Sequence, residues 1–204
     1  MIANQAAVAV KNSQLADLLV ERDVPPRLFR DLRDGAEDGE DLVRRRAGLL
    51  GGDLAQPHLP ILLEAAVDVP ARAEVNTRLA TTLRHRLEEA YPGSLTYADC
   101  IVWVLLRLPP AAVDERQILS DLAMRVGREF GAGVTGGAGR RCTTVASYRR
   151  GFAEAAEALR VSARGSGGGL ARFDDLGGVA GRSYNGSLPG GGGAAGGTRS
   201  AGHA

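Results

Sequence analysis

The apolar run Leu59–Val67 constrains the fold of this chain more than any other segment. It has the length of a strand, it lies between Pro57 and Pro70, and it contains one charged residue, Glu64. A continuous apolar run of this length, with breakers at both ends, is typical of a buried central strand. We therefore expect a sheet built around these residues.

The rest of the apolar pattern alternates between helical and strand-like segments. Apolar residues at helical spacing predict an amphipathic helix over 73–90. Ala98-Asp99 offers a tight turn between two short apolar runs, which predicts a hairpin. The hairpin strands span 94–97 and 100–106, followed by a helix over 113–130, a strand over 131–134, a helix over 144–164 and a strand over 170–173. The order βαββαβαβ predicts the α/β (α+β) class, a mixed sheet with helices packed mainly on one face.

Both ends of the chain differ from this pattern. Residues 2–21 carry one apolar stripe at helical spacing, and Pro25-Pro26 is expected to stop that helix. Helical stretches from Leu28 and over 42–50 follow. We therefore divide the chain into a terminal helix (1–25), a helical connector (26–56), the α/β domain (57–178) and a glycine-rich tail (179–204). The tail has no apolar period, so we expect it to be disordered.

Charge and cysteine content narrow the function classes. The 25 basic and 24 acidic residues give a net charge of +1, so no global field favours nucleic acid or an anionic membrane. The longest strongly apolar run, 100–106, is far shorter than a membrane span of about 20 residues. The first residues lack the pattern of a signal peptide, and Cys100 and Cys142 have no metal-like spacing. We expect a cytoplasmic protein without a membrane partner.

A glycine-rich segment offers the sharpest motif. Gly131-Ala132-Gly133-Val134-Thr135-Gly136 fits GxGxxG literally, and Arg140-Arg141 could hold an anion beside it. A dinucleotide site needs this pattern between a strand and the helix that receives the pyrophosphate, whereas here a helix precedes it. We expect these glycines to form a turn after a short strand, and the two arginines to form a solvated rim.

Several segments resemble PucR/CdaR-type bacterial transcriptional regulators. Ala146-Ser147-Tyr148 to Leu159 and Phe173-Asp174-Asp175-Leu176-Gly177 are similar to the end of the GGDEF-like domain of these proteins, and Leu49–Leu54 is similar to its start. Ile2–Val10 resembles the terminal helix of a GAF sensor domain. The resemblance implies a degenerate nucleotide-cyclase fold over 57–178. The family places a DNA-binding helix-turn-helix after this domain, and the sequence shows no such pair of helices.

Cyclase chemistry would require several carboxylates around two metal ions and a Gly-Gly-acidic hairpin. The matching hairpin reads Leu95-Thr96-Tyr97-Ala98-Asp99-Cys100, and the first strand offers only Glu64. One Asp and one Glu are too few, so we expect no enzyme activity and interpret Asp99 as a turn residue.

The remaining polar residues predict no catalytic, cofactor-binding or metal site. Asp174-Asp175 lacks further oxygen ligands in register, which favours a turn or helix cap. Ser147 has no His and acid at a triad spacing, and Trp103 lies in an apolar strand, which favours the core. The histidines His58, His85 and His203 are scattered over a loop, a polar helix position and the tail.

We therefore expect a fragment of a PucR/CdaR-type regulator, a non-catalytic regulatory and dimerisation domain without its own DNA-binding module. The apolar stripe of residues 2–19 favours a weak homodimer or a mixed dimer with related regulators. Two alternatives stay open: a nucleotide-binding enzyme that uses the 131–139 glycine-rich loop, and a stand-alone interaction domain that pairs with full-length regulators. No cofactor and no specific DNA binding are expected.

Overall fold

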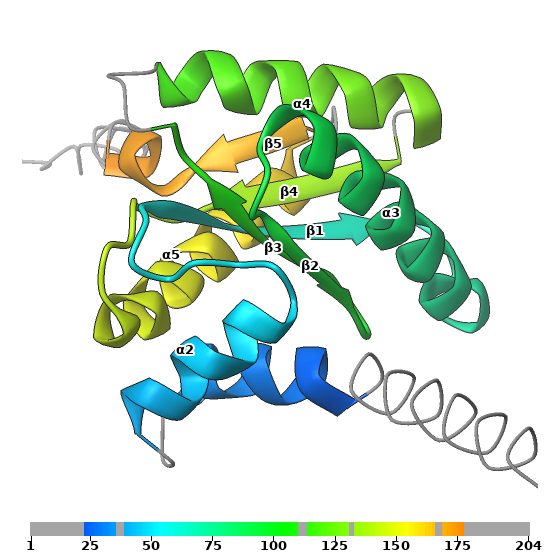
Figure 1. Ribbon diagram of the computed structural model, residues 1–204. Coiled ribbons are helices and arrows are strands. Elements are labelled where there is room, and N and C mark those ends of the chain that lie inside the picture. Colours follow the sequence, from blue (N-terminus) through cyan, green and yellow to red (C-terminus); the bar gives the residue numbers. More distant parts are fainter. Residues whose placement is uncertain (1–22, 36–38, 110–113, 131–132, 166–168, 178–204) are drawn as a thin grey trace, which may run out of the picture.

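The computed structural model describes residues 23–35, 39–109, 114–130, 133–165 and 169–177 (Figure 1). Its named elements are α2 (Glu40–Leu49), β1 (His58–Ala65), α3 (Val69–Ala90), β2 (Leu95–Ala98), β3 (Val102–Arg107), α4 (Glu115–Phe130), β4 (Val134–Ala138), α5 (Val145–Arg164) and β5 (Gly169–Arg172). Residues 23–34 and 173–177 are also helical. The prediction of a βαββαβαβ domain is confirmed.

The five strands form one mixed sheet in the order β2-β3-β1-β4-β5. β1 lies at the centre, antiparallel to β3 on one side and to β4 on the other, so that Leu62 lies between Trp103 and Gly137. β4 and β5 are parallel. The central position of the apolar run after Pro57 is therefore confirmed.

Helices cover both faces of the sheet, so the prediction of helices mainly on one face is wrong. The side chains of β1 alternate: Leu59, Ile61 and Leu63 face α3 and α4, whereas Leu62 faces the opposite core. That second core includes buried residues of α5 and α2 and of helical residues 23–34. A continuous apolar run needs apolar neighbours on both sides, because both faces of its strand must leave water.

The segment described above as a connector contributes directly to this second core. Phe29, on helical residues 23–34, stacks on Tyr97 at a centroid distance of 5.8 Å and lies 6.2 Å from the ring of Phe152. Trp103 is 7% exposed and lies 5.2 Å from Phe152, so its assignment to the core is confirmed. The aromatic rings join helical residues 23–34, the β2–β3 hairpin and α5 in one cluster.

Pro25 and Pro26 lie within helical backbone rather than in a helix break. The predicted helix over 2–21 and the predicted disorder of 179–204 lie outside the described residues. Within the described ranges, no helix combines the length and the apolar character that crossing a membrane requires.

The glycine-rich segment forms part of the sheet, so its interpretation as a turn after a strand at 131–134 is wrong. Gly136 and Gly137 lie inside β4, which spans Val134–Ala138. A Cβ at Gly137 would overlap the backbone of Leu159 and Ala155 on α5. These glycines are required because the helix backbone lies directly on the strand.

Candidate functional site

Glu64 and Asp99, the two carboxylates weighed above for cyclase chemistry, lie near the end of β1 and in the turn between β2 and β3. Glu64, near the end of β1, forms an ion pair with Arg72 on α3 at 2.9 Å. Both side chains are about one third exposed. The only carboxylate of the first strand is therefore neutralised by a guanidinium from the next helix.

Asp99 lies in the turn between β2 and β3, as predicted, and its carboxylate has several donors. One oxygen accepts hydrogen bonds from the backbone N–H of Ile101 and from Nε1 of Trp103, both at 3.0 Å. Asn76, fully buried on α3, donates from Nδ2 to the carbonyl of Cys100 at 2.8 Å. These contacts fix the hairpin tip against α3 and the aromatic cluster.

Cys100 and Cys142 are free thiols in different environments. Cys100 is exposed beside Asp99, and burial together with the Asp99 charge raises the pKa of its thiol. Cys142 is buried, and its burial also raises the pKa of its thiol. Across the described residues, no group of three or more His, Cys, Asp or Glu side chains could hold a metal ion.

The glycine-rich segment leaves no cradle for a pyrophosphate at β4. Gly136, Gly137 and Gly139 are buried, and their α-carbons face Leu63, α5 and Gly151 rather than solvent. Gly131 and Ala132 lie outside the described residues. Gly136 and Gly137 pair with β1 and β5 within the sheet, and the N–H of Gly139 donates to the carbonyl of Pro60 at 2.9 Å.

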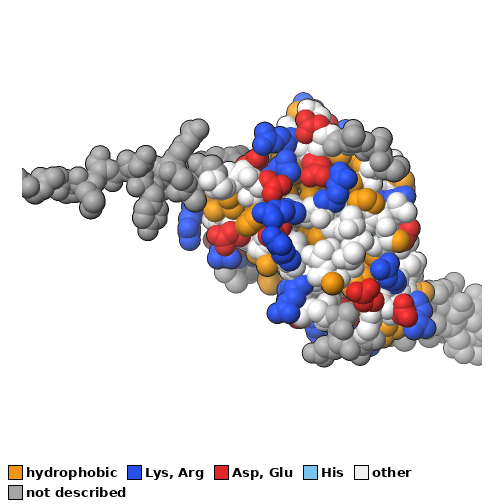
Figure 2. Space-filling view, turned by 90° about the vertical axis from the view of Figure 1, so that its left-hand side faces the viewer, with side chains coloured by type: hydrophobic (Ala, Val, Ile, Leu, Met, Phe, Trp, Pro, Cys, Tyr) orange, Lys and Arg blue, Asp and Glu red, His pale blue; other side chains and the backbone are white. Residues whose placement is uncertain are grey.

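One face of the molecule carries interspersed arginine and carboxylate side chains (Figure 2). Arg140 and Arg141 take part in an ion-pair network that extends over the last described segment. Arg140 pairs with Asp174 at 2.8 Å, and Arg141 pairs with Glu115 at 2.9 Å. The network also includes Arg172 with Glu115 and Asp174, Arg116 with Asp175, and Arg140 and Arg150 with Glu154. Asp174-Asp175 therefore holds the end of the domain through arginines.

The remaining polar candidates show no functional arrangement among the described residues. Ser147 donates to the carbonyl of Thr144 at 2.6 Å and accepts from its N–H at 3.3 Å, which closes the first turn of α5. His85 is exposed on α3, and His203 lies outside the described residues.

His58 was expected in a loop, but it is the first residue of β1 and is fully buried. Its Nδ1 lies 3.0 Å from the hydroxyl of Tyr148 and 2.8 Å from the carbonyl of Gln56. Burial lowers the pKa of His58 below the usual value, and the carbonyls of Gln56 and Gly93 oppose that shift. Burial raises the pKa of Tyr148, so both side chains stay neutral near pH 7.

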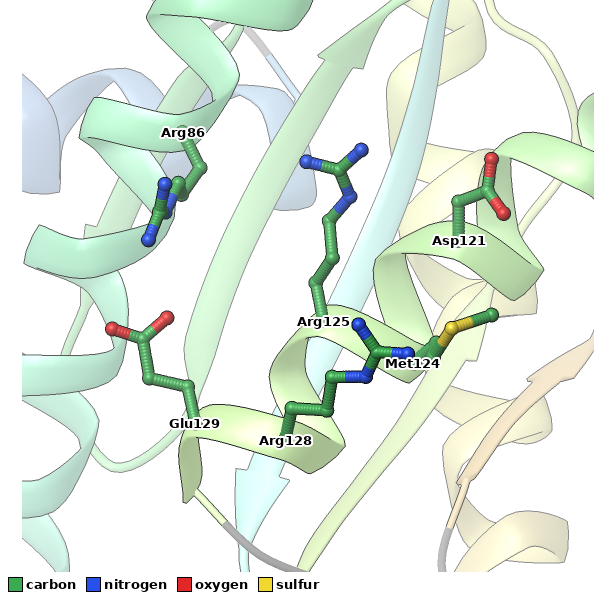
Figure 3. A pocket seen from close by; sticks show the side chains of 6 residues that line it. All are labelled: Arg86, Asp121, Met124, Arg125, Arg128 and Glu129. Carbon is green, nitrogen blue, oxygen red and sulfur yellow. The ribbon is translucent and has the colours of Figure 1, made fainter.

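A groove between α3 and α4 was not predicted (Figure 3). Its cavity volume is about 600 Å3, and its lining residues are Arg86, Asp121, Met124, Arg125, Arg128 and Glu129. We call it the α3–α4 groove. Its residues come from two helices far apart in sequence, and no local motif signals them.

None of the curated proteins compared with the chain matches it. The model of one family, the GGDEF-like domain, matches residues 34–161. This range includes every element from α2 to β4 and most of α5. The match covers more than half of the chain, and the mixed sheet has the order expected for a nucleotide-cyclase-like fold. The chain belongs to the GGDEF-like domain family.

Proposed function

We propose that this chain is a non-catalytic regulatory and dimerisation domain, a fragment of a PucR/CdaR-type transcriptional regulator. The observation that carries the non-catalytic part is the engagement of both candidate carboxylates. Glu64 is paired with Arg72, and Asp99 accepts hydrogen bonds from Ile101 and Trp103. Two-metal chemistry on a triphosphate needs carboxylates that are free to bind cations.

The hairpin supports the same proposal. A nucleotide-binding hairpin requires glycines so that ligand and backbone can approach closely. This one carries Tyr97, which stacks on Phe29, and Leu95, which is buried in the core. The side chains of Leu95 and Tyr97 fill the space next to the strands, and Tyr97 joins the hairpin to helical residues 23–34.

The regulatory part of the proposal is supported by the resemblance around α5 and residues 173–177. In PucR/CdaR-type proteins this end of the domain leads to the DNA-binding module. Here the ion-pair network attaches that end to α4 and to the loop before α5. Because residues 173–177 are attached to the rest of the domain in this way, a change at the domain surface could be transmitted through them to a DNA-binding module of the regulator. We propose that the domain has this regulatory role in the cytoplasm.

Catalysis is tested by incubating the purified chain with guanosine triphosphate and magnesium and separating the products by chromatography. We expect intact nucleotide, at the level of a heat-killed sample. An active diguanylate cyclase is the positive control. Product above the heat-killed level would refute the non-catalytic assignment.

Regulation is tested by co-expressing the tagged chain with a full-length PucR-type regulator and measuring co-purification. We expect mixed dimers, because the two proteins would share the dimerisation element. Failure to co-purify, together with a monomeric state of the chain alone, would refute the dimerisation role. The alternative of a nucleotide enzyme built on the 131–139 loop has little support, because Gly136 and Gly137 lie in the sheet.

A further inference from the structure

We propose that the α3–α4 groove binds an organic phosphate of nucleotide size, without a metal ion. The site lies on the outer side of the helix layer, on the opposite face of the sheet from the α2–α5 core. It is separate from the hairpin and from the glycine-rich strand. The proposal is independent of the absence of catalysis.

Unpaired positive charge is the first observation. The chain is rich in arginine, and arginine and carboxylate side chains are interspersed on the face shown in Figure 2. Several arginines pair with carboxylates, among them Arg116, Arg140 and Arg141. Among the described residues, Arg86, Arg125 and Arg128 have no carboxylate partner, although Asp121 and Glu129 line the same groove. Guanidinium groups bind phosphate oxygens through paired, charge-assisted hydrogen bonds. Three such groups around one cavity favour an oxyanion.

The shape of the groove is the second observation. Its volume of about 600 Å3 suits a small molecule of some tens of atoms rather than a single inorganic ion. In Figure 3, Arg125 and Glu129 extend from α4 into the space between the helices, whereas the guanidinium group of Arg86 lies over α3 at the side of that space. The two helices thus present polar side chains to the same space.

The floor of the groove is apolar, which is the third observation. A narrower extension shares Arg86, Asp121 and Arg125 with the groove. It is lined by Leu87, Tyr91, Ile118 and Leu122 as well. Met124, at the rim, is 49% exposed. A flat organic ring would cover these apolar atoms while its phosphates meet the arginines.

The two carboxylates give the site its selectivity. Asp121 accepts a hydrogen bond from Gln117 at 3.0 Å, and Glu129 has no described partner. Both can accept hydrogen bonds from amino or hydroxyl groups of a ligand. Both also repel any anion, and a ligand that donates hydrogen bonds to them offsets this repulsion. The groove therefore favours an organic phosphate with hydrogen-bond donors over inorganic phosphate.

The test is a titration of the intact chain with ATP in the presence of EDTA, followed by calorimetry. Tripolyphosphate and adenosine, which correspond to the phosphate and nucleoside parts of ATP, are titrated separately for comparison. We expect ATP to bind, and each half to bind at least tenfold more weakly. The variants Arg125→Ser and Arg128→Ser should each weaken ATP binding by about tenfold or more, because each removes a charge-assisted contact.

Arg84→Ser is the matched control, because Arg84 is exposed on α3 but does not line the groove. It should leave ATP binding unchanged. Thermal unfolding checks that all variants fold, which is expected since the three arginines are exposed. The proposal is overturned if ATP does not bind at millimolar concentration, if Arg84→Ser weakens binding as much as the groove variants, or if tripolyphosphate binds as tightly as ATP. Turnover of nucleotide would refute the non-catalytic function and leave this result unaffected.

Discussion

At the scale of single residues, glycine and histidine show how much depends on contacts far along the chain. Gly137 is in contact with the backbone of α5, whereas Gly127 on α4 has open space around its α-carbon. His58 is fully buried, and its Nδ1 lies 3.0 Å from the hydroxyl of Tyr148, ninety positions later in the sequence. The two glycines therefore differ in whether a larger side chain can replace them.

Gly137→Ala is expected to destabilise the domain by about 3 kcal/mol or more, because the added methyl overlaps helix backbone that cannot move alone. Gly127→Ala, the matched control, should stabilise it by about 0.5 to 1 kcal/mol, because alanine loses less backbone entropy in a helix. Urea unfolding followed by circular dichroism measures both. Similar midpoints for the two variants would contradict the close contact.

The stability of the domain should depend on pH through His58. The pKa of His58 in the folded protein lies below its usual value of 6.5. At a pH between the folded pKa and 6.5, the unfolded state therefore binds a proton that the folded state does not bind. The free energy of unfolding is therefore constant above pH 6.5 and falls as pH decreases below it. His58→Gln, which cannot be protonated, should show a flatter profile between pH 6.5 and 5. Parallel profiles in urea titrations would rule out this role.

At the scale of elements, the order of strands and helices predicted from periodicity for the α/β domain is confirmed. The position of β4 and the contacts between the elements could not be predicted from the local pattern. Glycines usually mark turns, so Gly136-Gly137 was assigned to one, whereas close helix packing requires them inside β4. The α3–α4 groove was missed because Arg86 and Arg128 are far apart in sequence and each looks like an ordinary surface arginine. The turn at Asp99 was predictable because its side chain bonds its own backbone neighbours.

The ion-pair network makes β5 and residues 173–177 dependent on α4. Glu115 is bonded by Arg141 at 2.9 Å and by Arg172 at 3.3 Å, and its side chain is 18% exposed. Glu115→Gln should lower the free energy of unfolding by about 1 to 2 kcal/mol, which lies between the values typical of exposed and of buried ion pairs. It should also raise hydrogen exchange in β5. Glu157→Gln, which affects an exposed pair with Arg160 on one helix, is the control and should change stability by less than about 0.5 kcal/mol. Equal exchange in β5 for both variants would show that the network does not hold this strand.

At the scale of the whole molecule, self-association is the property that the described residues do not determine. The apolar stripe of residues 2–19 lies outside them, and the prediction that it pairs with a second copy stays a prediction. Each buried leucine of such a stripe would contribute about 1.5 to 3 kcal/mol before the cost of association. Leu15→Asp with Leu18→Asp should therefore convert a weak dimer into a monomer in sedimentation equilibrium. Asn12→Asp with Ser13→Asp carries the same charge change as a control, and equal effects of the two pairs would exclude the stripe.

The central position of β1 affects how the protein is made. Its neighbours β3 and β4 lie about 40 and 75 residues later in the sequence, so Leu62 cannot meet Trp103 or Gly137 until most of the chain has left the ribosome. A nascent chain that ends after β3 has an unsatisfied row of backbone groups along the other edge of its most apolar strand. Such an edge favours pairing with other nascent chains. Slow translation between β3 and β4 would therefore lower the soluble yield of this protein, even though the finished sheet buries that edge completely.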